Sequence, residues 1–181
     1  AFSLGQVSLP RMIRIAIVGC GRIAKRHADL LSTGQIMGAQ LVAACDVVAE
    51  RSHSFARQYN VPGYGVLAEM LERANADVVA VLTPSGSHAA VAIEVARASR
   101  HIIVEKPMAL TLEDADAMIA AADAAGVRLF VVKQNRFNVP VVKARQALEA
   151  GRLGKLVLGT VRVRWCRDQS YYDRDAWRGT W

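Results

Sequence analysis

The chain has 181 residues, enough for one well-buried domain and part of another, and its 52% hydrophobic and 22% charged residues are typical of a folded, soluble protein. A net charge of +7 would suit nucleic acid, but the basic residues are spread along the chain and aromatic residues make up only 6%, so we expect no nucleic-acid partner. Neither a membrane-spanning stretch nor a signal peptide is evident, so we expect no membrane association and a cytoplasmic location.

The cysteines indicate no metal site. Cys20, Cys45 and Cys166 include no C-x-x-C pair, and no histidines stand near them at metal-ligand spacing. We expect free, buried thiols.

The first predicted strand, residues 13–18, follows a loose terminus of residues 1–10 and leads into the sequence Gly-Cys-Gly-Arg-Ile-Ala at residues 19–24. In this G-x-G-x-x-A pattern Gly19 permits a tight turn, Gly21 lets the backbone approach a pyrophosphate, and the small Ala24 lets the next helix pack closely on the strand. The helix N–H groups would then face the phosphates. The alternative is a simple strand-to-helix turn.

A second strand, residues 40–45, ends on Asp46, about twenty-five residues after Gly21. An acidic residue near this position binds the adenosine ribose hydroxyls, and its carboxylate would repel a 2′-phosphate, so the sequence favours NAD over NADP. Arg51 leaves NADP open, because an arginine nearby can accommodate that phosphate. Asp46 is also a candidate N-cap for a helix over residues 49–59.

A third strand, residues 77–82, runs into a small polar loop that begins with Thr83 and Pro84. At the carboxyl end of a strand this loop would lie along a cofactor cleft. His88 opens the following helix. Its alternative role is structural, as an imidazole satisfied by a loop carbonyl.

The fourth strand, residues 101–104, stops on Glu105, Lys106 and Pro107, and a helix is expected over residues 111–125. In parallel sheets ligands bind beyond the carboxyl ends of the strands, so Lys106 would point at a site. The alternative is an exposed charge pair at a strand end, which contributes little.

The fifth strand, residues 127–132, ends on a donor-rich segment, Lys-Gln-Asn-Arg-Phe-Asn, at residues 133–138. This segment is either a wall of the site or a solvated loop. A basic helix is expected over residues 141–150. Residues 156–165 then alternate with period two, as in a half-exposed strand of another sheet.

These elements predict an α/β fold. A doubly wound parallel Rossmann sheet occupies residues 11–138, and residues 139–181 form a linker helix and the first strand of a truncated C-terminal α/β domain. Because single strands are not stable alone, we expect the chain to be a piece of a longer protein.

Taken in order, the glycine loop, Thr83-Pro84 with His88, and Glu105-Lys106-Pro107 resemble the glucose-fructose oxidoreductase, inositol dehydrogenase and MocA family from Arg11 onward. The resemblance implies a Rossmann domain joined to an open-sheet α/β domain, a nicotinamide cofactor, oxidation or reduction of sugars and inositols, and a cis peptide bond before Pro107. The cofactor-binding residues that it and the motifs above predict are Gly19, Gly21, Arg22, Ile23, Ala24, Asp46, Thr83, Pro84, His88, Glu105, Lys106 and Gln134.

A narrower resemblance rests on residues 133–140, on Tyr171-Tyr172-Asp173 and on residues 177–181. These are similar to segments of the dehydrogenases that oxidise the 3-hydroxyl of UDP-N-acetylglucosaminuronate for bacterial surface polysaccharides. Arginine forks match the phosphate and carboxylate oxygens of such a substrate. The predicted substrate-binding residues are Lys106, Asn135, Arg136, Arg164, Tyr172 and Arg178. Relatives assemble through the second-domain sheet, so we expect the whole protein to be a homodimer or homotetramer.

The resemblance places Lys106 in the catalytic site. It would act either as a general base, if burial beside the cofactor lowers its pKa, or as an ammonium that polarises the hydroxyl while a second-domain histidine is the base. Relatives carry that histidine and an aspartate beyond a glycine-rich turn that this sequence lacks, so we expect the fragment itself to be inactive. The rival hypothesis is a regulator or scaffold that binds NAD without turnover and has no need of Lys106.

Overall fold

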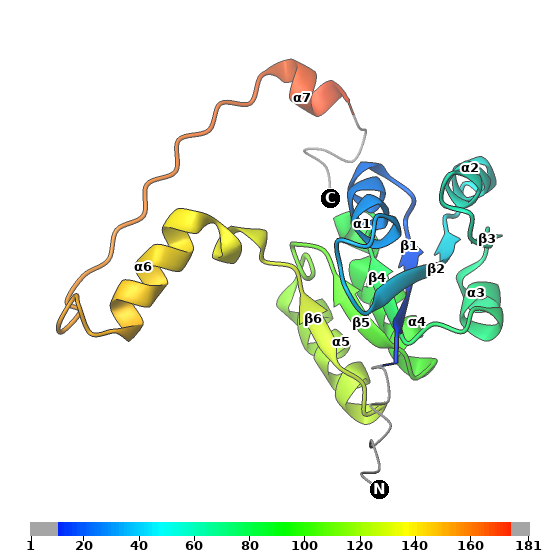
Figure 1. Ribbon diagram of the computed structural model, residues 1–181, viewed down its shortest axis with the longest axis horizontal. Helices are drawn as coiled ribbons and strands as arrows, with labels where there is room; N and C mark the ends of the chain where they lie inside the picture. The colour runs from blue at the N-terminus through cyan, green and yellow to red at the C-terminus, as the bar shows by residue number, and fades with distance from the viewer. Residues whose placement is uncertain (1–10, 175–181) are drawn as a thin grey trace, which may run out of the picture. The chain divides into compact units, whose positions relative to one another are not determined.

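The computed structural model describes residues 11–174 (Figure 1). The predicted loose terminus and Arg178 lie outside the described residues. The chain divides into two compact units, Ala1–Val132 and Lys133–Trp181, and the domain boundary after residue 138 stays a prediction.

The first unit contains one sheet in which every paired strand is parallel to its neighbour. The strands are β1 (Ile13–Val18), β2 (Ala39–Cys45), β3 (Gly63–Tyr64), β4 (Val78–Val81), β5 (His101–Val104) and β6 (Leu129–Val131). Their spatial order is β3-β2-β1-β4-β5-β6, the order of dinucleotide-binding sheets. The predicted doubly wound Rossmann sheet is therefore confirmed.

The sequence predicted five strands for this sheet, whereas the structure has six. The missed strand is β3, which has only two residues and shows no periodicity. The strands expected as third, fourth and fifth are β4, β5 and β6. The helices of the first unit are α1 (Arg22–Ser32), α2 (Ala49–Tyr59), α3 (Leu67–Arg73), α4 (His88–Arg97) and α5 (Leu112–Ala124), and a 3₁₀ turn, η1, spans Ser85–Ser87.

The core lies on both faces of the sheet because the central strands are covered on each side, which is why they read as continuous apolar runs. Ala16 and Val18 face a cluster that includes side chains of α3, α4 and α5. Ile17, on the opposite face, packs with Ala24 of α1 and with Phe55 of α2. This two-sided burial holds the carboxyl ends of β1 and β4 in place.

An ion pair fixes the opposite edge of the sheet, where β1 and β4 begin. The Asp77 carboxylate accepts hydrogen bonds from the Arg14 guanidinium (2.7 and 3.0 Å), from the Arg14 backbone N–H (2.9 Å) and from Arg11 (2.9 Å). The hydrogen bonds from Arg14, with the charge of Arg11, hold the pKa of Asp77 well below its usual range.

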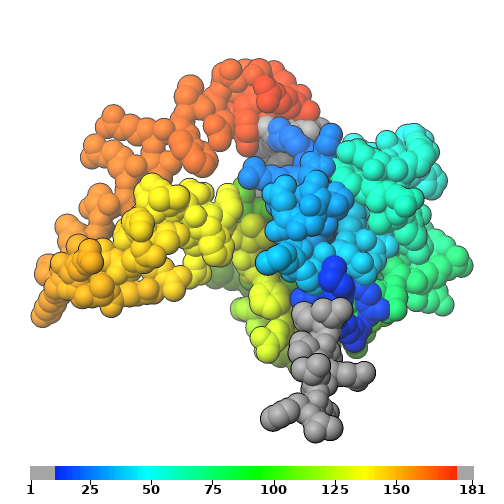
Figure 2. Space-filling model, viewed as in Figure 1, coloured from blue at the N-terminus to red at the C-terminus, as the bar shows by residue number. Residues whose placement is uncertain are grey.

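The second unit contains a 3₁₀ turn, η2 (Gln134–Phe137), and two helices, α6 (Val139–Glu149) and α7 (Gln169–Asp173). Residues 156–165, predicted as the first strand of a further sheet, pair with no other strand in the part of the chain that the structure describes. A strand needs a neighbour to satisfy its backbone groups, and among residues 133–174 none is present, so this strand stays a prediction. Figure 2 shows the segment as a narrow orange band, and Val157 and Val161 are 91% and 90% exposed.

None of the helices within residues 11–174 is long and apolar enough to span a membrane.

Candidate cofactor and active site

The carboxyl ends of β1, β2, β4 and β5 meet at one edge of the first unit. Three backbone hydrogen bonds continue the sheet past the strands: Gly19 N–H to Cys45 O (2.8 Å), Leu82 N–H to Val18 O (2.8 Å) and Glu105 N–H to Val81 O (3.1 Å). They gather the glycine loop, Asp46, Thr83 and Glu105 along one edge. The sequence predicted this grouping from the strand ends alone.

Gly19 is held in a conformation that only glycine adopts easily. Its φ is +92°, and a Cβ there would lie 2.8 Å from the Leu82 carbonyl carbon and oxygen and from the Thr83 nitrogen. The loop therefore passes directly against the end of β4, and the predicted tight turn is present.

Gly21 differs from Gly19, because a Cβ at Gly21 would meet no atom within 4 Å. Gly21 is the N-cap of α1, which has neither a capping side chain nor an acidic residue in its first turn. The space beside Gly21 at the start of the helix is therefore open, and a helix N-terminus without an acidic cap suits a pyrophosphate. Ala24 is fully buried, as the close packing of α1 on the sheet requires, whereas Arg22 and Ile23 are exposed.

Asp46 joins the glycine loop to the end of β2. The side chain is buried, and its two oxygens accept hydrogen bonds from the backbone N–H groups of Cys20 and Val48, each at 2.9 Å. The alternative role as N-cap of α2 was wrong, because Val48 occupies that position without a side-chain cap. Each carboxylate oxygen has a further lone pair that can accept a hydrogen bond from a ribose hydroxyl. This contact with the ribose stays a prediction.

The thiols next to the loop are free, and burial raises the pKa of Cys20 to about 12 and that of Cys45 to about 11. They stay protonated near neutral pH and supply no nucleophile. The expectation of buried thiols holds for Cys45 but was wrong for Cys166, which is exposed. Among residues 11–174, no group of three or more His, Cys, Asp or Glu side chains could hold a metal ion.

The loop after β4 is tied to the turn after β5 by His88. The imidazole is 1% exposed, its Nε2 lies 2.9 Å from the Thr83 carbonyl oxygen, and its Nδ1 lies 2.8 Å from the Pro107 carbonyl oxygen. This matches the structural alternative, an imidazole that donates a hydrogen bond to a loop carbonyl, and the buried ring does not support the predicted direct contact with a cofactor. Thr83 is half-buried and Pro84 exposed, and the Thr83 hydroxyl accepts a hydrogen bond from Ser87 (2.9 Å).

Lys106 lies at the end of β5, and the peptide bond between it and Pro107 is cis, as the resemblance implies. The Lys106 side chain is exposed, so the first unit itself does not provide the burial expected around it.

Glu105 is not one half of an exposed charge pair, so that alternative was wrong. Its side chain is only 13% exposed, and Oε1 lies 3.3 Å from Nε2 of His27 on α1. Oε2 accepts the Lys106 backbone N–H (3.1 Å). The hydrogen bond with His27, together with the Lys106 backbone N–H, lowers the pKa of Glu105. The sequence motifs did not predict a role for His27. Its position on α1, one turn after Ala24 of the glycine motif, is the feature of the sequence that could have pointed to it.

The remaining predicted residues lie in the second unit. Gln134, Asn135 and Arg136 form the exposed turn η2, Arg164 lies in the extended segment, and Tyr172 in α7 is 42% exposed. Their roles toward cofactor and substrate stay predictions.

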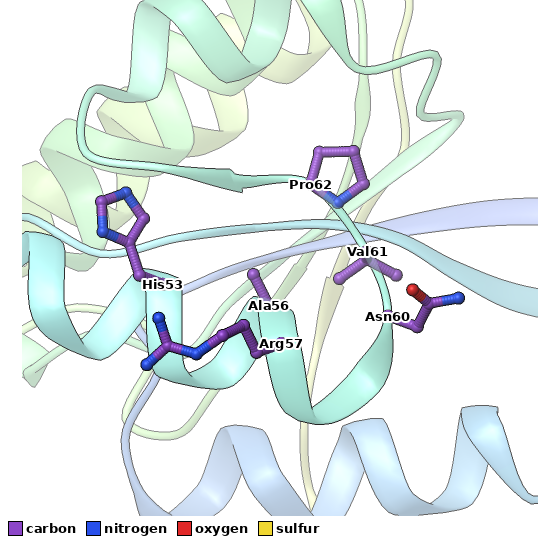
Figure 3. A pocket seen from close by; sticks show the side chains of 6 residues that line it. All are labelled: His53, Ala56, Arg57, Asn60, Val61 and Pro62. Carbon is purple, nitrogen blue, oxygen red and sulfur yellow. The ribbon is translucent and has the colours of Figure 1, made fainter.

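A shallow hollow lies beside the carboxyl end of α2, where Figure 3 shows the side chains that line it. Its lining residues are His53, Ala56, Arg57, Asn60, Val61 and Pro62. None of them belongs to the predicted site.

Comparison with known proteins decides the family. A model described as "Oxidoreductase family, NAD-binding Rossmann fold", that of the Gfo/Idh/MocA proteins, matches residues 13–133. The chain belongs to this family. The resemblance seen in the three motifs is confirmed, and NAD is the cofactor that the family binds.

Several relatives of the chain are sugar or inositol dehydrogenases. Myo-inositol 2-dehydrogenase from Thermotoga maritima is 35% identical over 144 residues, which are 79% of this chain and 42% of that protein. The WlbA dehydrogenase from Bordetella pertussis, solved in complex with NADH and UDP-GlcNAcA, is 45% identical with a TM-score of 0.87, over 93% of this chain and 51% of that one. WlbA from Chromobacterium violaceum is 40% identical with a TM-score of 0.88. The chain thus spans about half the length of its relatives.

Proposed function

We propose that this chain is the cofactor-binding half of a NAD-dependent dehydrogenase that oxidises the 3-hydroxyl of UDP-N-acetylglucosaminuronate. The observation that carries the proposal is the 45% identity, over 93% of the chain, to a dehydrogenase crystallised with NADH and UDP-GlcNAcA. The motifs at the strand ends support the same class of reaction, since they combine a glycine loop after β1 with a lysine after β5, at the same edge of the sheet.

The chain's own residues would hold the cofactor in three places. The N-terminus of α1, opened by Gly21, faces the pyrophosphate, Asp46 receives the adenosine ribose hydroxyls, and the loop at Thr83 borders the nicotinamide half. When bound, NAD accepts the hydride from the carbon that carries the hydroxyl.

Lys106 acts on the hydroxyl oxygen from which the proton leaves. As a neutral amine it takes that proton, and as an ammonium it donates a hydrogen bond that polarises the hydroxyl while another base takes the proton. The two roles predict opposite dependences of kcat/KM on pH. If Lys106 is the base, kcat/KM rises as Lys106 loses its proton, and if Lys106 acts as the ammonium, kcat/KM falls with the same loss. Arg136, Arg164 and Arg178 are the proposed partners of the negative charges of the nucleotide sugar.

The test is formation of NADH, followed by its absorbance, with NAD and UDP-N-acetylglucosaminuronate. We expect the 181-residue chain to bind NAD in calorimetry without turnover. Turnover is expected when the chain is fused after Trp181 to the C-terminal half of the Bordetella pertussis relative. UDP-N-acetylglucosamine, which lacks the carboxylate, and myo-inositol are the control substrates.

Tight NAD binding without turnover of any of these substrates by the fusion would contradict the proposal. That result would favour the alternative, a NAD-binding regulator or scaffold. Turnover of myo-inositol alone would keep the reaction class and overturn the nucleotide-sugar substrate.

A further inference from the structure

Glu105 stands next to the proposed catalytic lysine, yet its carboxylate is directed to another element. Oε1 lies 3.3 Å from the His27 imidazole, and Oε2 is occupied by a backbone N–H. Among residues 11–174 the Lys106 ammonium forms no ion pair. The Glu105 carboxylate and the Lys106 ammonium are neighbours in sequence but do not form an ion pair with each other.

His27 belongs to α1, the helix whose N-terminus begins at the glycine loop. Its contact with Glu105 joins two segments 78 residues apart and links that helix to the end of β5. The pair is largely protected from solvent, with side-chain exposures of 30% for His27 and 13% for Glu105. Because water screens this contact less than it screens an exposed ion pair, the contact restricts the Glu105 side-chain rotamer more strongly.

We propose that His27 is a positioning residue for Lys106. It holds the Glu105 carboxylate on α1, which leaves the Lys106 ammonium free to face the substrate hydroxyl. Without His27, the carboxylate loses its side-chain partner and turns to the adjacent ammonium, which a new ion pair then withdraws from the site. The inference deepens the proposed function and rests on it for the role of Lys106, but the contact itself is a property of the first unit.

The first experiment measures the availability of the Lys106 amine without any turnover. The 181-residue chain is labelled with trace acetic anhydride at neutral pH, and acetylation of Lys106 is quantified by mass spectrometry relative to the denatured chain. We expect His27→Ala to lower Lys106 labelling by about two- to fivefold, the upper part of the range for one ion pair near a protein surface. The double variant His27→Ala/Glu105→Gln should return to the wild-type value, because no carboxylate remains to capture the amine.

Two variants serve as controls. His27→Gln keeps an N–H donor toward Glu105 and should label as the wild type does, and His53→Ala removes an exposed histidine from α2, away from the site, and should change nothing. Should His27→Ala fail to fold in a thermal melt, His27→Leu keeps the volume of the side chain without a donor and replaces it. Wild-type labelling in the donor-free variant, or low labelling in the double variant, overturns the proposal.

The second experiment uses the fusion that is designed to turn over substrate. His27→Ala should lower kcat by about tenfold while the KM for NAD changes less than about threefold, since His27 acts through Lys106 and not on the cofactor. His27→Gln should restore kcat. A fusion without turnover counts against the proposed function alone, because the labelling experiment still decides the role of His27. An equal loss of kcat in the glutamine variant overturns that role.

Discussion

The two units use similar apolar residues in opposite ways. In the first unit the strand β4 reads Val-Val-Ala-Val and is buried along its whole length. In the second unit Val157, Val161 and Val163 belong to an equally apolar stretch and are 91%, 90% and 66% exposed. The difference lies in the neighbours: β4 has β1 and β5 on its two sides, whereas residues 156–165 pair with no strand that the structure describes.

This comparison shows that an apolar pattern specifies a strand only together with its partners. Backbone groups left without a sheet neighbour are satisfied by water, and the apolar side chains then stay exposed with them. The predicted cofactor contacts lie mainly in the unit that has its own core. The predicted substrate contacts lie mainly in the second unit, whose described residues, 133–174, include none of the buried core residues.

The largest expected effect tests burial directly. Val79→Asp places a charge where the native side chain is fully buried, and we expect it to prevent folding, because an unpaired buried carboxylate costs several kcal/mol. Val157→Asp, its matched control, should leave the melting temperature of the 181-residue chain unchanged. Circular dichroism and thermal melting of both variants check this, and equal destabilisation would show that the second unit is packed after all.

The next effect concerns the chemistry that we place in the first unit. Lys106→Ala should lower kcat of the fusion by about 10²- to 10⁴-fold, the usual contribution of a group that transfers or stabilises a proton. The melting temperature should stay close to that of the wild type, because the side chain is exposed. Lys155→Ala, an exposed lysine of the second unit, is the control. A loss below threefold for Lys106→Ala would remove it from the mechanism.

The two glycines of the loop should separate stability from binding. Gly19→Ala forces a Cβ against the backbone of Leu82 in a left-handed conformation, and we expect a loss of about 3 kcal/mol in the free energy of unfolding. Gly21→Ala should change stability by less than about 1 kcal/mol but weaken NAD binding, since its Cβ occupies the space in front of the helix. Urea unfolding and calorimetry measure the pair. Similar stability for both variants would contradict the close approach at Gly19.

The smallest effect concerns the edge of the sheet opposite the site. The pKa of Asp77 is lower in the folded chain than in the unfolded one, so its stabilisation is present above the unfolded value of about 4 and is lost as the pH falls through and below it. Asp77→Asn should cost about 1 kcal/mol at pH 7, because solvent screens this partly exposed pair. The difference between wild type and variant in urea should shrink below pH 4. A constant difference would exclude the ion pair as its cause.

Local patterns predicted most of the first unit. The apolar runs gave five of its strands, and the spacing of Gly19, Gly21 and Ala24 gave the loop, because turn conformation and close packing depend on residues adjacent in the chain. The ends of parallel strands lie at one edge of a sheet, so the gathering of Asp46, Thr83 and Lys106 followed as well.

Pairings between distant segments were not predictable in the same way. The contact of His27 with Glu105, the two carbonyl partners of His88 and the backbone partners of Asp46 depend on how α1, β2, β4 and β5 are placed against one another. No periodicity within an element contains that information. The strand expected at residues 156–165 stays a prediction for the same reason, since its hydrogen bonds have to come from another segment.

By itself the sequence determined the parallel α/β sheet, the glycine loop and the position of Lys106 at a strand end, because each follows from conformational preferences over a few adjacent residues. The tertiary structure alone decided which polar groups meet at that edge: Asp46 with the glycine loop, His88 with two carbonyls, and Glu105 with His27 instead of Lys106. Hydrogen bonds act over about 3 Å, so which of them form is settled only when packing brings distant segments within that distance.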